Sequence, residues 1–398
     1  MTPIELAETG KGTTATVILS EEQANLLEES KFVDVTKGHA AGDWTITSKR
    51  GWVGSFSIGR HEFRVNPKIT ISRLLFLISY AKNPDGWLND QVSVGTAEGV
   101  VSAVAQTLWR QVEAALLLGL LHGYREIEDS SMTMRGRLRL GDQLRRRFDQ
   151  ALPMEIHYDD FTSDIAENQL LLEAITRMLE VPGVDNNSRL RLEGLRRKFD
   201  NVRPLSRNEA PPTWQPGRLN QRYQPALELA QIILHTRSPE HAPGNLGVNG
   251  FMFNLEEVFE DFVARAVGDA LRQRMAGSPI PTYEDRLDRG GKIKIELDMV
   301  WQVNAQPVVA VDAKYKTKQT NDNLFQMLAY CTALNIHQGH LIYADGPAPL
   351  RRYEVRHCSV ELYVHALDLT ASRQELLGRI DEIADTIVAS MSRHEPTR

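Results

Sequence analysis

Short runs of β-branched and aromatic residues, separated by glycines, fill the first hundred positions of the chain. These runs predict strands over residues 13–20, 32–35, 44–47, 52–58 and 62–71. Residues 21–30 instead predict a helix, with Ser20 as its N-terminal cap. Strands of this length and spacing are typical of a small barrel or sandwich. We therefore expect a β-rich N-terminal domain over residues 1–95.

From about residue 96 the apolar positions recur at helical spacing, and the first helix should run from about Val100 to His122. Residues 114–124 are uncharged but are only 11 in number, whereas a membrane span needs about 20, so they predict a buried helix. Further helices are expected over residues 165–179, 188–199 and 219–235, with a strand at 134–140. Linkers are expected at 204–216 and 238–250, where proline, glycine and asparagine gather. Residues 96–245 thus read as a helical middle region.

The last part of the chain alternates long helical segments with apolar strand segments. Helices are predicted over residues 254–275, 322–334 and 372–391, and strands over 292–301, 308–314, 340–343 and 354–366. The order helix–strand–strand–helix–strand indicates an α/β core over residues 246–398. The predicted fold class is therefore multidomain α+β, with a β-rich N-terminal domain, a helical middle and a C-terminal α/β domain.

Composition and charge narrow the class of protein. Hydrophobic residues make up 42% of the chain and charged residues 25%, which fits a globular protein and excludes disordered, collagen-like and heptad-rod chains. A formal net charge of −6 argues against a protein that coats nucleic acid or an anionic membrane. Cys331 and Cys358 have neither a disulfide framework nor a zinc-site spacing. With no secretory start, we expect a cytoplasmic protein without a membrane partner.

Acidic residues occur in two predicted strands that are otherwise apolar. Alternation along the second strand places Asp312 and Lys314 on one face, and the 13 residues between Asp298 and Asp312 allow a hairpin that brings the carboxylates together. Converging carboxylates repel unless a cation lies between them, and hard oxygen ligands select Mg²⁺. A nearby lysine can stabilise charge on a phosphoryl group. The pattern therefore predicts a metal-dependent phosphodiesterase, although Asp-x-Lys also occurs as an ordinary ion pair on solvated strands.

Two further features strengthen the metal-site prediction. A helix with Glu256, Glu257 and Glu260 precedes the strands, and Gln326 lies in the helix that follows them. With these residues, the segment from about 254 to 366 resembles the PD-(D/E)XK nuclease superfamily, the restriction-endonuclease-like core. The resemblance implies metal ligation by Asp298 and Asp312, a catalytic role for Lys314, a supporting ligand from Glu260 and a positioning role for Gln326. The apolar stripe of the first helix leaves open which of its glutamates faces the site.

A narrower resemblance extends over most of the chain from about residue 50. Segments at 253–263, 312–316 and 326–330, together with upstream segments at 65–81, 134–138 and 164–168, are similar to the McrC family, the nuclease subunits of modification-dependent McrBC restriction systems. This resemblance implies an Mg²⁺-dependent DNA endonuclease that works with an McrB-like AAA+ GTPase ring and stimulates its GTP hydrolysis. It also implies that the N-terminal part engages the ring and that the ring binds the GTP. The chain has no GxxxxGK[ST] phosphate loop, which agrees with a separate nucleotide-hydrolysing partner.

Basic residues are concentrated in the middle of the chain. Residues 189–222 contain nine Lys or Arg and three acidic residues, and Arg145 and Arg146 belong to a second cluster. We expect Arg145, Arg146, Arg196, Arg197 and Lys198 to contact double-stranded DNA. The alternatives are a socket for an acidic partner surface and a solvated helix face.

Self-association through the nuclease domain is a further expectation. Two other functions stay open at this stage: a stand-alone nuclease without a motor, and a non-catalytic assembly or activator subunit.

Overall fold

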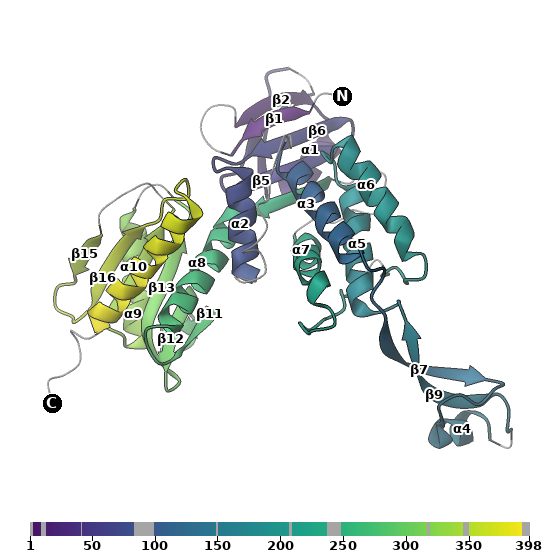
Figure 1. Ribbon diagram of the computed structural model, residues 1–398. Helices are drawn as coiled ribbons and strands as arrows, with labels where there is room; N and C mark the ends of the chain where they lie inside the picture. Colours follow the sequence, from purple (N-terminus) through teal and green to yellow (C-terminus); the bar gives the residue numbers. More distant parts are fainter. Residues whose placement is uncertain are drawn as a thin grey trace. The chain divides into compact units, whose positions relative to one another are not determined.

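The computed structural model describes residues 3–8, 13–40, 42–82, 99–148, 150–206, 209–236, 248–316, 319–344 and 350–391. These residues form a mixed α/β fold with four sheets, divided into two compact units (Figure 1). One unit comprises Met1–Ala103 and Arg237–Arg398, and the other comprises Val104–Thr236. Within the described ranges, every helix is too short or too polar to cross a bilayer.

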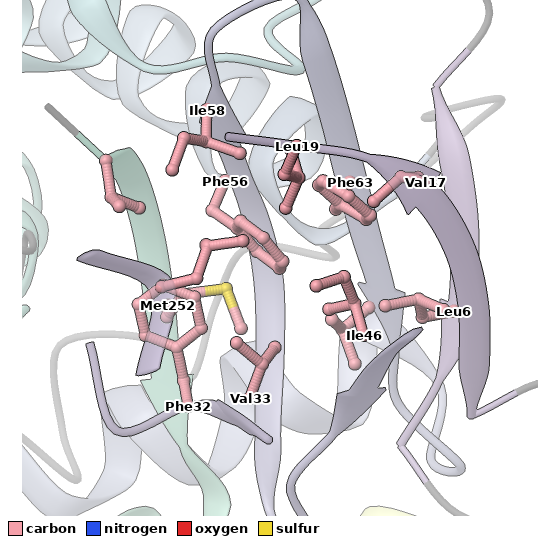
Figure 2. Packing of buried hydrophobic residues seen from close by; sticks show 13 residues of the cluster. Leu6, Val17, Leu19, Phe32, Val33, Ile46, Phe56, Ile58, Phe63 and Met252 are labelled. Atoms are coloured by element: carbon pink, nitrogen blue, oxygen red, sulfur yellow. The ribbon is translucent and has the colours of Figure 1, made fainter. Parts of the chain in front are cut away.

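Two small sheets occupy the N-terminal part of the first unit. The four-stranded sheet has the order β1-β6-β5-β10, and the three-stranded sheet has the order β2-β4-β3. The strands are β1 (Ile4–Ala7), β2 (Thr14–Ile18), β3 (Val33–Lys37), β4 (Asp43–Ser48), β5 (Trp52–Ile58), β6 (His61–Asn66) and β10 (Asn249–Asn254). Figure 2 shows their shared core, in which Leu6, Ile46, Phe56, Phe63 and Met252 pack together. Burial of these side chains holds the two sheets together.

Helix α1 (Glu21–Glu29) confirms the predicted capping by Ser20. The Ser20 hydroxyl accepts a hydrogen bond from the backbone N–H of Gln23, and the Gln23 side chain accepts one from the backbone N–H of Ser20. This reciprocal pair satisfies two backbone donors that the first helical turn leaves open.

Strand β10 joins the N-terminal sheet although it lies about 190 positions after β5 in the sequence, and it pairs antiparallel with β5. The two backbones approach so closely at Gly54 that a Cβ atom there would lie 2.1 Å from the carbonyl oxygen of Phe251. Only glycine fits this position, where φ is +139°. The expected linker at 238–250 lies mostly outside the described residues, and its last two positions already belong to β10. The segments predicted as first and last domains therefore belong to one unit.

The C-terminal part of the first unit is built on a six-stranded sheet with the order β11-β12-β13-β14-β16-β15. Its strands are β11 (Ser278–Arg286), β12 (Lys294–Val303), β13 (Gln306–Lys314), β14 (Gln338–Tyr343), β15 (Arg351–Glu354) and β16 (Glu361–Ala366). Strands β13, β14 and β16 are parallel, and the other neighbours are antiparallel. The two edge strands, β11 and β15, were not predicted as separate strands from the sequence.

Helices cover both faces of this sheet. They are α8 (Leu255–Arg272), α9 (Asn321–Leu334) and α10 (Arg373–Met391), and α2 (Ile71–Lys82) packs against α8. Gly339 of β14 lies against Met327 and Cys331 of α9, whereas its neighbour Gln338 accepts a hydrogen bond from Ser390 of α10. Because successive residues of a strand point to opposite faces, α9 and α10 lie on opposite sides of the sheet.

The second unit contains a helical body and a projecting three-stranded sheet (Figure 1). The helices of the body are α3 (Val100–Ala115), whose first turn belongs to the other unit, α5 (Ala166–Glu180), α6 (Asn186–Arg196), η1 (Arg197–Phe199), η2 (Gln221–Tyr223) and α7 (Gln224–His235). The projecting part, which we call the arm, consists of β7 (Gly123–Ser131), β8 (Arg137–Leu138), α4 (Leu140–Arg146) and β9 (Met154–Thr162). Its sheet has the order β7-β9-β8.

The buried helix predicted over residues 114–124 is wrong. Helix α3 ends at Ala115, Gly119 adopts a left-handed conformation with φ +81°, and β7 begins at Gly123. Leu117 and Leu118 are 78% and 83% exposed. Glycine in this conformation ends the helix, and the following leucines remain on the surface.

Candidate active site

Asp298 and Asp312 lie side by side on the antiparallel strands β12 and β13. The register pairs Met299 with Val311, so the two aspartates occupy the next position along the strands. The backbone N–H of Ala313 donates a hydrogen bond of 2.6 Å to Asp298 Oδ2. Asp312 is only 2% exposed. The hairpin thus brings the two carboxylates together, as their spacing in the sequence suggests.

Lys314 neutralises part of this acidic group. Its Nζ lies 2.5 Å from Asp312 Oδ2, two residues earlier on the same strand. Burial alone would lower the pKa of Lys314, but Asp312, Asp298 and Glu260 together raise it. The lysine therefore stays protonated beside the carboxylates.

The charges of Asp298, Asp312 and Lys314 also act on Glu260 of α8. Burial raises its pKa to about 8, and the negative charge of Asp298 is the next largest cause, with Asp312 contributing as well. Glu257 is exposed and instead accepts a hydrogen bond from Asn254, the residue that caps α8. The charges of both aspartates act on Glu260, which is therefore the glutamate of α8 that we assign to the site.

The two aspartates hold protons more tightly than ordinary carboxylic acids do. Burial, followed by the charge of Asp312, raises the pKa of Asp298 to about 7, and burial also raises the pKa of Asp312. Mutual repulsion in a buried site is relieved by protons or by a cation, so this set of oxygen donors fits Mg²⁺. Over the described ranges, however, no three His, Cys, Asp or Glu side chains are already gathered as ligands around one point. Lys314 instead contacts Asp312.

Helix α9 contributes Gln326 and a residue that the sequence reasoning did not assign to the site, Tyr330. Tyr330 is buried, and its pKa is raised to about 12, first by burial and then by the charge of Asp312. Gln326 is exposed and shares a side-chain hydrogen bond with the Tyr330 hydroxyl. The four-residue spacing of Gln326 and Tyr330, which places them on one helix face, was the signal that could have identified the tyrosine.

A cleft of about 530 Å³ opens beside Asp298 and Glu260. Its walls come from α8, β11, β12 and the end of α2, and they include Glu257, Asp261, Arg265, Thr282 and Glu296. The cleft gives solvent and ligands access to one side of the carboxylate group.

The five residues predicted to bind DNA lie in the second unit, in two separate segments of the chain that belong to three elements, α4, α6 and η1. Arg145 and Arg146 lie on α4 of the arm, where they form ion pairs with Asp142 at 2.8 Å and Glu155 at 3.5 Å. Arg196 ends α6, and Arg197 and Lys198 follow it in η1, all exposed. The structure therefore does not bring the five side chains into one patch. Arg207, which belongs to the same basic stretch of sequence, lies outside the described residues.

His340 is part of a buried network rather than a metal site. Its Nδ1 lies 3.0 Å from His365 Nε2, and its ring stacks on Tyr363. His337, which has a ligand-like spacing to His340 in the sequence, is exposed and lies 2.9 Å from the Ser359 hydroxyl.

Comparisons with known proteins find solved structures that this chain is similar to. One chain of a solved structure from Thermococcus gammatolerans, described as a half-complex from a tetradecameric assembly of McrB AAA+ hexamers with bound McrC, is 15% identical. The match covers 97% of this chain and 100% of that chain, with a TM-score of 0.59. A second solved structure, the McrBC complex from the same organism, matches 68% of this chain and 88% of its own at 15% identity, with a TM-score of 0.42. No curated protein matches.

The family comparison is more direct, because it rests on sequence. The profile described as "McrBC 5-methylcytosine restriction system component" matches residues 48–344, which is more than half of the chain. The resemblance drawn from the sequence motifs is confirmed: the chain belongs to the McrBC 5-methylcytosine restriction system component family.

Proposed function

We propose that this chain is the DNA-cutting subunit of an McrBC-like restriction system and that its six-stranded sheet is a PD-(D/E)XK nuclease core. The observation that carries the proposal is the pairing of Asp298 and Asp312 on neighbouring strands, with Lys314 bound to Asp312. Family membership makes a nuclease subunit the expected role for such a site. The reaction is hydrolysis of a phosphodiester bond in double-stranded DNA.

Each side chain of the site has a role that follows from its environment. Asp298 and Asp312 would hold Mg²⁺, and Glu260 would support it from α8. When bound, Mg²⁺ activates water and neutralises charge on the reacting phosphoryl group. Lys314, which stays protonated, donates a hydrogen bond to the phosphoryl oxygen on which negative charge develops. Gln326, which bonds to Tyr330 at the exposed edge of α9, orients the DNA backbone or the attacking water.

The substitution Asp312→Asn tests the site directly. It keeps the shape of the side chain but removes the charge, so we expect cleavage of methylated plasmid DNA to be abolished in the presence of an McrB-like ring, GTP and Mg²⁺. Glu284→Gln is the matched control, because Glu284 is an exposed carboxylate of the neighbouring strand β11 that pairs with Lys294. GTP hydrolysis in the same reactions reports whether the complex has assembled. Undiminished cutting by Asp312→Asn would rule out the site.

An AAA+ ring is the partner we propose, because the similar solved assembly contains McrB AAA+ hexamers with bound McrC. Exposed apolar side chains favour the arm as the contact surface. Large ones lie along it at Tyr124, Met132, Met134, Leu140, Leu144, Phe148, Leu152 and Phe161. In the described part of the N-terminal sheets, by contrast, Ile18 is the sole exposed large hydrophobic residue. A concentration of exposed apolar side chains on one part of a fold favours a protein contact there.

DNA contact is better supported for the end of α6 than for α4. Arg196, Arg197 and Lys198 are exposed and form no ion pair within the described residues, so their charges are available for phosphates. The charges of Arg145 and Arg146 are already partly compensated by acidic residues of the arm. Self-association through the nuclease domain also stays part of the proposal, since the similar assembly is described as tetradecameric.

A further inference from the structure

A buried glutamate at the end of β1 contacts the residue that follows the proposed catalytic lysine. Glu8 is 2% exposed, and its Oε2 accepts hydrogen bonds from the backbone N–H of Lys68 at 3.1 Å and from the Tyr315 hydroxyl at 3.4 Å. Glu8 and Tyr315 are 307 positions apart in the sequence. This contact links the first strand of the N-terminal sheet to the end of β13.

The Tyr315 ring is held on several sides. It is 2% exposed, the Lys68 ammonium lies 4.4 Å from its centroid, and the Phe259 ring lies 6.2 Å away. Burial, followed by the negative charge of Glu8, raises the pKa of Tyr315, so its hydroxyl keeps the proton that it donates. Phe259 directly precedes Glu260 in α8. Tyr315 therefore lies between the two elements that carry Lys314 and Glu260.

Backbone pairing holds Lys314, whose carbonyl accepts a hydrogen bond of 3.0 Å from the backbone N–H of Ala344, but it does not extend to Tyr315. The register of β13 with β14 ends at the pair Lys314 and Tyr343, and Tyr315 is the first residue beyond the ladder. Beyond the last backbone pair, the hydrogen bond to Glu8 holds the Tyr315 side chain. Since Lys314 is adjacent, a shift of Tyr315 would move the lysine relative to Asp312.

The two carboxylate oxygens of Glu8 differ in their contacts. Its Oε1 is buried and has no hydrogen-bond partner in the described residues. Of the two Glu8 oxygens, Oε2 therefore carries the contact with Tyr315.

We propose that Glu8 is a positioning residue of the nuclease, which sets the place of Lys314 by holding Tyr315. The inference rests on the proposed function. It implies that the nuclease site is complete only when β1 is in place, although no residue of β1 belongs to the carboxylate group itself.

The first test is the rate of DNA cleavage at saturating methylated plasmid, with an McrB-like ring, GTP and Mg²⁺. We expect Glu8→Ala and Tyr315→Phe each to lower kcat by about tenfold to a hundredfold, the range for a displacement of about 1 Å at a reacting group. KM for DNA and the rate of GTP hydrolysis should not change. Glu8→Gln should keep the rate within about threefold, since its amide oxygen can accept both hydrogen bonds.

Glu5→Ala is the matched control, because Glu5 lies on the same strand and accepts a hydrogen bond from Asn66, away from the nuclease sheet. If Glu8→Ala cuts as fast as Glu5→Ala, the positioning role is wrong. If the wild-type chain does not cut while it still stimulates the ring, the proposed nuclease function fails, and the positioning role fails with it.

The second test does not depend on cleavage. Lys314 in the full-length chain is labelled with acetic anhydride, and the extent of labelling is measured by mass spectrometry against the other lysines. We expect Glu8→Ala to raise labelling of Lys314 at least about threefold, because the Lys314 side chain is only 17% exposed and one released from Asp312 is more accessible to the reagent. Equal labelling in Glu8→Ala, Glu8→Gln and the wild type would overturn the inference. Thermal unfolding of each variant shows that it is folded.

Discussion

Burial and charge together decide the protonation of the candidate site. Glu260 and Asp298, with pKa values raised to about 8 and about 7, carry protons at neutral pH for part of the time, whereas Lys314 remains charged. A divalent cation that enters this group must displace protons, so its affinity should increase with pH. Lys314 is the cation already present, and it occupies the place beside Asp312 that a metal would also favour.

The buried pair of His340 and His365 gives the fold a dependence on acid. Burial lowers the pKa of His365 to about 3 and that of His340 well below 6.5. A folded-state pKa below the unfolded value means that the neutral ring stabilises the fold above about pH 6.5 and that this contribution is lost as the pH falls. Between pH 6.5 and about pH 4.5 His365 alone should remove about 2 kcal/mol of unfolding free energy, at about 1.4 kcal/mol per pH unit for one proton, and His340 adds to the loss.

Urea unfolding at several pH values measures this loss. The raised carboxylate pKa values act in the opposite direction, but they are common to all variants, so the difference between wild type and His365→Gln isolates the histidine. His337→Gln, which changes an exposed ring, is the control. A pH slope that is the same in wild type and His365→Gln would contradict the assignment.

The sequence alone could predict the strand residues of the site but not all of its helix and loop partners. Alternation along two apolar strands was enough to pair Asp298 with Asp312 and to place Lys314 beside them. The glutamate that the first helix contributes could not be chosen from Glu256, Glu257 and Glu260 by sequence alone, because helix periodicity leaves more than one of them at the edge of the apolar stripe. Glu8 lies 307 positions from Tyr315, and no local pattern reports a contact over that distance.

At the scale of elements, the arm is the part whose surface differs most from an ordinary solvated sheet. Phe148 is 82% exposed just after α4, and Leu144 within that helix is 62% exposed. We expect Phe148→Asp to lower the stimulation of a McrB-like GTPase by about tenfold or more, as loss of a central apolar anchor does in protein interfaces. The initial rate of GTP hydrolysis, with and without the chain, measures this effect.

Leu190→Asp provides the comparison, because Leu190 is a 69% exposed leucine on α6, outside the arm. Both substitutions place a charge at an exposed position, so neither should affect folding by more than about 0.5 kcal/mol. Equal stimulation by the two variants would remove the arm from the contact surface.

Charge and sequence distance explain two of the element predictions that failed, besides the helix that Gly119 ends. Strands β7 and β9 carry acidic residues such as Glu126, Glu128 and Asp159 on a solvated sheet, so they lack the apolar alternation that reveals a strand. Strand β10 contains the apolar run Phe251–Phe253, which is compatible with a strand. Its partner β5 lies about 190 positions earlier in the sequence, so only the tertiary pairing shows which sheet β10 joins. The helices of the body and the strands β12 and β13 were predictable because burial on one or both faces imposes a regular pattern.

At the scale of the whole molecule, the second unit is an insertion between the two segments of the first. Each unit has its own core, so calorimetry of the full chain should show two unfolding transitions. Mg²⁺ should stabilise only the unit that contains Asp298 and Asp312. The unfolding free energy of that unit should increase by about 2.7 kcal/mol at a Mg²⁺ concentration one hundred times the dissociation constant.

A separate sample of residues 99–236 identifies which transition belongs to the inserted unit. The Asp312→Asn variant should lose the response to Mg²⁺ and keep both transitions. A single transition for the full chain, or a Mg²⁺ response in the segment 99–236, would contradict this division of the molecule.

The pairing of β10 with β5 also has a consequence for synthesis on the ribosome. Strands β1 to β6 emerge early, but the strand that completes their sheet is made only after the whole inserted unit. Until then, β5 presents an open edge with Phe56 and Val53 beside it, a surface on which nascent chains aggregate or recruit chaperones. The arrival of β10 closes that edge and, in the same step, sets the start of α8. The N-terminal sheet is therefore complete only once the residues directly before α8 have been made.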